Sequence, residues 1–238
     1  DFRIEGRVLS RRFRRPLVPQ TQFLRSGEYI GGLSLVTAML DAIQKHWPEF
    51  LMEAALLGLF MVSACGFAWL LYHPASPVSP AMGLTAVGLI YSPWGKQSGA
   101  HMNPALTLNF LRLGKIAPWD AAFYCLFQCV GGAMGVLTMR AMLGDGIVDR
   151  SVNYVLTLPG PRGEASAFAA EVLISGGMMF MVLCSTNSPL FAPYTGLLAG
   201  ALVALYISFE APLSGMSINP ARSFGSAVVA GNWTSFWI

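Results

Sequence analysis

The sequence has 238 residues, of which 54% are hydrophobic and 11% are charged, and its formal net charge is +3. Soluble domains carry about 25% charged residues, so this composition excludes an ordinary water-soluble domain and indicates a membrane protein. The four cysteines all lie in apolar segments, which excludes the disulfide framework of a secreted domain and indicates small core residues: Cys65, Cys125, Cys129 and Cys184. Cys125 and Cys129 lie one helical turn apart, but no His or carboxylate joins them, and we expect no metal site.

The amino-terminal tail, residues 1–48, is basic. It holds eight of the fifteen Lys and Arg residues, six of them between Arg3 and Arg15, and such a charge favours the cytoplasmic side. The arginine run is typical of solvated disorder, with an anionic-lipid contact or a targeting remnant as alternatives. Five apolar residues before Pro48 share one face of a short helix that we expect on the membrane surface: Leu35, Val36, Met39, Leu40 and Ile43. Pro48 is then expected to open the first span.

Long stretches without charged residues predict the membrane spans. A helix needs about 20 apolar residues to cross the hydrocarbon core, and we predict spans at 50–72, 80–94, 118–139, 165–186 and 191–209. A sixth span opens at Trp233, but the sequence stops at Ile238. We therefore expect a truncated sixth helix, either because the sequence is a fragment, as its first residue Asp1 also suggests, or because the helix is lost.

Two related motifs divide the chain into halves. The stretch "SGAHMNPALTL" starts at Ser98, and "SGMSINPARSF" starts at Ser214, 116 residues later. The first follows the second span and the second follows the fifth, so each half has three spans and one motif. An odd number of spans forces the halves into opposite orientations. The sequence therefore predicts an all-α membrane protein with an inverted repeat, in which repeat one is about 49–140 and repeat two about 165–238.

Each Asn-Pro-Ala sequence reads as a helix start, because Asn is a strong N-cap and Pro a favoured first helical residue. The segments that follow, Pro104–Arg112 and Pro220–Ala230, are too short to cross a bilayer at about 1.5 Å per residue. We expect two re-entrant half-helices whose amino termini meet near the bilayer centre. The site residues predicted there are Asn103, Pro104, Ala105, Asn219, Pro220 and Ala221.

Such a meeting point disfavours cations and hydronium, because each helix start carries about half a positive charge and the Asn amides are donors. A neutral molecule that accepts hydrogen bonds is favoured, whereas an anion meets the desolvation penalty of a narrow apolar tube. Arg222 is the only charged residue from 211 to 238 and lies inside the second half-helix. We expect it to face the pore rather than to extend toward the surface from a span end.

Two acids support the repeat, because Glu53 precedes Asn103 by 50 residues and Glu171 precedes Asn219 by 48. A carboxylate in a span usually points inward to a polar partner, so we expect structural support behind each motif. Extension of a lone Glu from a helix end is the alternative. A secondary transporter would need a titratable group at the midplane, and these two acids are the candidates for it. No enzymatic constellation is present in the sequence.

At these residues the sequence resembles the aquaporin family. Both motifs look like its signature loops, and the likeness runs from Glu49 to Ile238 and includes "FQCVGGA" in the third span. The resemblance implies six tilted helices and two half-helices in a protomer, and a homotetramer in which each protomer has its own pore. It also implies a channel domain at 49–238 that needs no cofactor and binds no nucleic acid.

The resemblance assigns roles to individual residues. Asn103 and Asn219 correspond to the central pair, and the selectivity filter corresponds to Met82 (or its neighbour Gly83), Ile207, Met216 and Arg222. The ladder of carbonyl acceptors corresponds to Gly99, Ala100, His101, Gly215, Met216 and Ser217. His101 corresponds to a cytoplasmic-side pore residue, and a histidine packed in a loop is the alternative.

The filter departs from the pattern of strict water channels. Ile207 stands where they have His and Met82 where they have Phe, which favours glycerol or another small neutral solute. Ser223, Ala227 and the pair Phe236-Trp237 resemble water channels instead. We predict a passive water channel in the cell membrane that excludes protons and ions, with a facilitator of glycerol or other small neutral solutes as the alternative.

Overall fold

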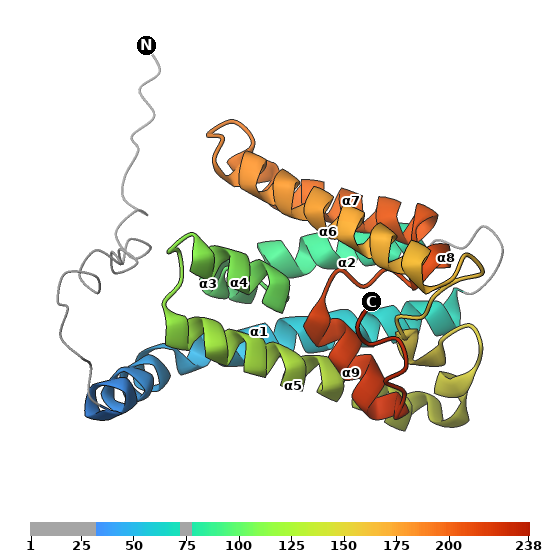
Figure 1. Ribbon diagram of the computed structural model, residues 1–238, viewed down its shortest axis with the longest axis horizontal. Coiled ribbons are helices and arrows are strands. Elements are labelled where there is room, and N and C mark those ends of the chain that lie inside the picture. The colour runs from blue at the N-terminus through green and yellow to red at the C-terminus, as the bar shows by residue number, and fades with distance from the viewer. Residues whose placement is uncertain (1–31, 72–77) are drawn as a thin grey trace, which may run out of the picture.

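The computed structural model describes residues 32–71 and 78–238 (Figure 1). Within these ranges the regular elements are all helices. The α-helices are α1 (Gly32–Leu70), α2 (Val78–Tyr91), α3 (Pro93–Ser98), α4 (Pro104–Arg112), α5 (Pro118–Leu143), α6 (Glu164–Thr186), α7 (Thr195–Phe209), α8 (Ala211–Ser214) and α9 (Pro220–Ala230). Three short 3-10 helices complete the set: η2 (Gly144–Val148), η3 (Asn153–Val155) and η4 (Ala192–Tyr194). Both halves contain the same series of two helices, a short helix and a half-helix.

Among the described residues, four helical segments are long and apolar enough to cross a membrane: Ser34–Leu70, Pro118–Val148, Glu164–Thr186 and Ala192–Phe209. The shorter apolar helix Val78–Tyr91 occupies the predicted second span. That span was predicted to run to residue 94, but α2 ends at Tyr91. Ser92 adopts an extended conformation, and its hydroxyl accepts the backbone N–H of Gly95, so that a separate helix α3 begins at Pro93. These five helices confirm an all-α fold with several apolar spans.

The helix start predicted at Pro48 is wrong, because α1 runs without a break from Gly32 through Pro48 to Leu70. The missing N–H of proline removes one helical hydrogen bond, and the rest of this 39-residue helix retains its pattern around it. The expected surface helix is therefore the first part of α1. Its apolar face is largely exposed, as expected for a surface that meets lipid: Leu35, Val36, Leu40 and Ile43. The arginine run between Arg3 and Arg15 lies outside the described residues.

The half-helices α4 and α9 have the predicted bounds. Their N-cap residues Asn103 and Asn219 are extended, with φ of −157° and −147°. The helix α9 ends at Gly231, whose φ of 68° is a left-handed conformation that glycine adopts without strain. Figure 1 shows α4 toward the left of the molecule and α9 toward the right, and both half-helices contact α5. The sixth helix predicted to open at Trp233 is not seen in the described residues, in which 234–237 form turns.

Glycines in the third span explain how the layers approach one another. A Cβ on Gly131 would lie 2.0 Å from the Ala54 carbonyl oxygen of α1, and one on Gly225 of α9 would lie 2.5 Å from the Gly132 carbonyl carbon. Helix α5 therefore packs backbone to backbone against α1 on one side and α9 on the other, as membrane helices with small interface residues do. This packing fixes α9, which carries Arg222.

Candidate functional site

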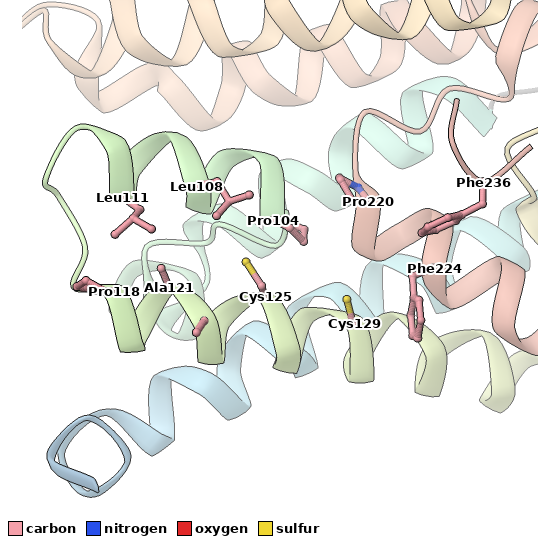
Figure 2. Close-up of a pocket in the computed structure, with 11 residues that line it drawn as sticks. Pro104, Leu108, Leu111, Pro118, Ala121, Cys125, Cys129, Pro220, Phe224 and Phe236 are labelled. Atoms are coloured by element: carbon pink, nitrogen blue, oxygen red, sulfur yellow. The ribbon is translucent and has the colours of Figure 1, made fainter. Parts of the chain in front are cut away.

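The amino termini of the two half-helices are joined by their N-cap residues. Asn103 Oδ1 accepts the backbone N–H of Ala105 at 2.9 Å, and Asn219 Oδ1 accepts that of Ala221 at 3.1 Å. The amide groups cross over: Asn103 Nδ2 donates to the Ile218 carbonyl at 2.8 Å, and Asn219 Nδ2 donates to the Met102 carbonyl at 2.7 Å. Figure 2 shows Pro104 and Pro220, the first residues of α4 and α9, on facing helix ends. The structure thus brings the predicted central pair together.

The loops that lead into the half-helices are strained in the same way. Ala100 and Met102 in the first loop have φ of 49° and 48°, and Met216 and Ile218 in the second have 52° and 47°. Left-handed conformations of such residues cost about 1–3 kcal/mol each and persist only where the surroundings hold them. The two buried carboxylates supply that hold.

Glu53 is fully buried and accepts four hydrogen bonds in the first loop and its surroundings. Its oxygens accept the N–H groups of His101 at 2.9 Å and Met102 at 2.6 Å, together with Ser98 Oγ and Gln128 Nε2 at 2.7 Å each. A trans peptide directs its N–H and its C=O to opposite sides. The carbonyls of Ala100 and His101 are therefore turned away from Glu53, which is the orientation that an acceptor ladder requires.

Glu171 repeats this arrangement in the second half. It accepts the N–H groups of Ser217 at 2.6 Å and Ile218 at 2.7 Å, and the hydroxyl of Ser214 at 2.5 Å. The carbonyls of Met216 and Ser217 are consequently turned away from the carboxylate. Both predicted supports therefore bind the loops directly, and neither extends from a helix end.

Three of the predicted filter residues meet in one apolar cluster. Met82 of α2 and Met216 of the second loop are buried in it together with Ala86 and Val203, and Ile207 of α7 packs against them. Gly83 faces α7 instead, since a Cβ there would lie 2.6 Å from the Gly200 carbonyl oxygen. This geometry favours Met82 over Gly83 as the filter residue that packs with Met216.

Arg222 is buried against a loop, residues 156–160, that the sequence did not predict as part of the site. Its Nη1 donates to Thr157 Oγ1 at 2.8 Å and its Nη2 to the Gly215 carbonyl at 3.2 Å. The backbone of this loop pairs with the start of the second motif and the residue before it, through Leu158 N to Ser214 O at 2.9 Å and Gly160 N to Leu213 O at 2.8 Å. The Gly215 carbonyl, predicted for the ladder, thus accepts a hydrogen bond from Arg222.

Two further residues of the site were missed. Thr157 also contacts Ser223 Oγ at 2.7 Å, and this hydroxyl lies 2.5 Å from Ser217 Oγ, which forms a buried chain of three hydroxyls beside Arg222. Glu210 is buried next to Ser214, so the candidate carboxylates are not restricted to Glu53 and Glu171. The sequence signal for Glu210 is an acidic residue four positions before the second motif. No comparable sequence pattern points to Thr157.

His101 is packed on several sides. Its Nδ1 lies 3.1 Å from Thr107 Oγ1, and its ring contacts those of Phe110 and Tyr124 at 5.0 and 5.3 Å between centroids. These contacts agree with the alternative of a histidine held in a loop. A pore-lining role stays a prediction.

An apolar groove lies between α4, α5 and α9, and its lining includes Pro104 and Pro220, the first residues of the two half-helices (Figure 2). It has a volume of about 460 Å³, and no charged side chain lines it. Figure 2 shows Leu108, Cys125 and Phe224 around it, and none of the filter residues. An apolar groove without polar groups to orient a solute does not fit a permeation path.

Comparison with known proteins shows the family of the chain. A family model described as "Major intrinsic protein" matches residues 37–238. The chain belongs to the major intrinsic protein family. Among curated relatives of this major intrinsic protein, Aquaporin NIP1-2 of Oryza sativa subsp. japonica is 35% identical over 158 residues, which cover 66% of the chain and 52% of the relative. Aquaporin NIP1-1 of Arabidopsis thaliana is 34% identical over 215 residues, covering 86% of the chain and 70% of the relative.

The chain spans about half the length of several curated relatives that it matches. A solved structure, described as the X-ray structure of the aquaglyceroporin from Plasmodium falciparum, superposes with a TM-score of 0.65 at 19% identity. The superposition covers 79% of this chain and 81% of that one, and shows the shared fold. Together with the apolar helices, family membership confirms the expected aquaporin-like fold of an integral, multi-pass membrane protein.

Proposed function

We propose that this major intrinsic protein is a passive channel that conducts water along an osmotic gradient and excludes protons and ions. The observation that carries the proposal is a reciprocal pair of hydrogen bonds at the facing ends of α4 and α9, in which Asn103 Nδ2 donates to the Ile218 carbonyl and Asn219 Nδ2 donates to the Met102 carbonyl. Each amide uses one N–H for this bond and retains a second donor for a passing molecule. The curated relatives that bear the name aquaporin support the same proposal.

Exclusion of cations follows from the charges at this point. Two helix amino termini, each with about half a positive charge, face one another, and the buried guanidinium of Arg222 adds a full charge on α9. A water at the centre donates no hydrogen bond to the Asn amides, so its neighbours on the two sides point in opposite directions. That arrangement interrupts the donor chain through which protons move.

A second candidate, a facilitator of glycerol or similar neutral solutes, is favoured by the apolar cluster of Met82, Ile207 and Met216. Such a wall desolvates the carbon face of a small polyol at low cost, while Arg222 can bind a hydroxyl. The experiment that separates the candidates is stopped-flow light scattering of proteoliposomes shocked in turn with an impermeant sugar and with glycerol. Fast shrinkage without glycerol re-swelling supports the water channel. Rapid re-swelling supports the facilitator.

The channel lies in the cell membrane with its amino terminus on the cytoplasmic side, and four copies form a homotetramer. Large exposed apolar residues such as Leu84, Leu173 and Phe180 support contact with lipid or with other copies. The protein acts as a channel rather than an enzyme or a secondary transporter. No group of three or more His, Cys, Asp or Glu residues that could hold a metal occurs in the part of the chain that the structure describes.

A further inference from the structure

Glu210 is a buried acid with an incomplete set of partners. It follows α7 directly and precedes α8, and its side chain is 6% exposed. Its Oε2 is buried without a hydrogen-bond partner among the described residues. A buried carboxylate that carries a charge needs donors or a cation for each oxygen. The contacts of its other oxygen, Oε1, therefore indicate whether Glu210 carries a proton.

That oxygen shares one hydroxyl with a second acid. Ser214 Oγ lies 2.5 Å from Glu210 Oε1 and 2.5 Å from Glu171 Oε1, and it accepts the backbone N–H of Met216 at 3.0 Å. A hydroxyl has one proton to donate and two lone pairs that accept. It can serve one carboxylate as a donor, and the other carboxyl group must donate its own proton to the remaining lone pair.

The donors around the two acids decide which one carries the proton. Glu171 also accepts the N–H groups of Ser217 and Ile218, one on each oxygen, and such bonds favour the charged form. No N–H group donates to the carboxyl of Glu210 in the contacts that the structure describes. An unpartnered carbonyl oxygen of a neutral acid is tolerated more easily than an unpartnered charged one. Ser214 therefore donates to Glu171 and accepts from Glu210.

The charges near Glu210 give the same assignment independently. Arg222 on α9 interacts electrostatically with Glu171 on α6 and with Glu210, and its third titratable neighbour is the Cys65 thiol on α1. When Glu210 is neutral, the positive charge of Arg222 and the negative charge of Glu171 compensate each other. Ionisation of Glu210 would leave one uncompensated negative charge in a buried cluster, which is strongly disfavoured.

The first half of the molecule has no acid at the equivalent position. Ser98 donates to Glu53 at 2.7 Å and accepts the N–H of Ala100 at 3.1 Å, as Ser214 does with Glu171 and Met216. The residue four positions before Ser98 is Trp94, whereas Glu210 stands four positions before Ser214. The additional acid thus belongs to the loop that carries Met216 and precedes Arg222.

We infer that Glu210 is a positioning residue, held as a neutral carboxylic acid that donates to Ser214 and keeps the second loop and Arg222 in place. Loss of its proton turns the contact with Ser214 into one between two acceptors. The new charge also attracts the Arg222 guanidinium away from Thr157 and Gly215. As the pH rises through the titration of Glu210, the filter therefore becomes less selective against cations. The flux part of this inference depends on the proposed function, and the protonation part does not.

Infrared spectroscopy of the protein in lipid vesicles tests the protonation directly, because a protonated carboxyl group has its own carbonyl stretch. We expect this band in the unaltered protein at neutral pH, its partial loss in Glu210→Gln, and its retention in Glu164→Gln, which removes an exposed acid at the start of α6. An identical band in the unaltered protein and in Glu210→Gln would overturn the inference, whether or not the protein conducts water.

Cation leak across the same vesicles supplies the functional readout. The unaltered protein and Glu164→Gln become several-fold more leaky to potassium as the pH rises into the alkaline range. Glu210→Gln stays tight throughout, because its amide N–H replaces the acid proton toward Ser214. The variant Glu210→Ala, without a donor, leaks already at neutral pH. A pH profile of Glu210→Gln equal to that of the unaltered protein contradicts the inference, and Glu210→Gln decides alone if Glu210→Ala does not fold.

Discussion

Asn103 and Asn219 each donate a side-chain hydrogen bond to the carbonyl of the residue that precedes the other, at 2.8 Å to Ile218 and 2.7 Å to Met102. Each of them also caps the half-helix that it begins. The same two amides therefore hold the helix ends, fix the strained loops and present the remaining donors at the centre. Structure and permeation depend on one pair of side chains.

Replacement of Asn103 or Asn219 by Leu should therefore reduce stability as well as water flux. The loss of a cap costs about 0.5–2 kcal/mol, and the unpartnered carbonyl left across the gap costs about 1–3 kcal/mol. Thermal unfolding in detergent and stopped-flow shrinkage measure the two effects. Asn109→Leu, at an exposed position on α4, is the matched control. Normal assembly and flux of both variants would contradict the account.

Replacement of Arg222 by Val should loosen the exclusion of cations and protons. The change removes the positive charge of the second half-helix and leaves Thr157 Oγ1 and the Gly215 carbonyl without their donor, so stability should also fall, by about 1–3 kcal/mol. Proton conductance of vesicles under an imposed pH gradient measures the leak. Arg112→Val removes an exposed arginine from the end of α4 and should leave the conductance unchanged. An unchanged conductance of Arg222→Val counts against a filter role.

Thr157→Val should produce a weaker form of the same defect. The substitution preserves the shape of the side chain and removes the hydroxyl that accepts from Arg222 and contacts Ser223. A hydrogen bond to a charged group contributes about 1.5–3 kcal/mol, so the guanidinium should gain alternative positions. The measurement is cation leak together with glycerol flux. Thr138→Val, on the exposed side of α5, is the control, and equal leak in the two variants would refute the positioning role of Thr157.

Ile207→His combined with Met82→Phe should lower any glycerol flux more than water flux. The pair replaces the two residues of the apolar cluster that depart from the pattern of strict water channels. The phenyl ring at position 82 narrows the pore. The imidazole at position 207 replaces apolar surface against which the carbon groups of glycerol are desolvated. Paired glycerol and sugar shocks measure both fluxes. An equal loss of both would show that these side chains do not form the filter.

Gly131→Ala should destabilise the protein although the substitution is small. Its Cβ would lie 2.0 Å from the Ala54 carbonyl oxygen, so α1 and α5 must separate, at a cost of about 1–3 kcal/mol. Thermal unfolding measures the effect. Gly176→Ala on α6, where nothing lies within 4 Å of the new Cβ, should be neutral or slightly stabilising. Equal stability of the two variants contradicts close packing of α1 on α5.

The parts of this fold that the sequence predicted are those determined by neighbouring residues. Asn-Pro starts and a terminal Gly gave the bounds of α4 and α9, and charge-free runs gave the five apolar spans. Pro48 misled the prediction because a proline inside a helix removes one hydrogen bond without necessarily ending the helix, and α1 continues through it. Thr157 was missed because its role comes from a loop 65 residues away from Arg222. Glu210 was missed because the charge-free run ends one residue before it.

The central claim is that the paired half-helices form a path for water through each protein. Its most direct test is the osmotic water permeability of proteoliposomes, measured over a range of temperatures beside protein-free liposomes of the same lipid. A channel predicts faster shrinkage with a weak temperature dependence, because water passes without dissolving in hydrocarbon. A permeability and temperature dependence equal to those of the protein-free liposomes would contradict the claim.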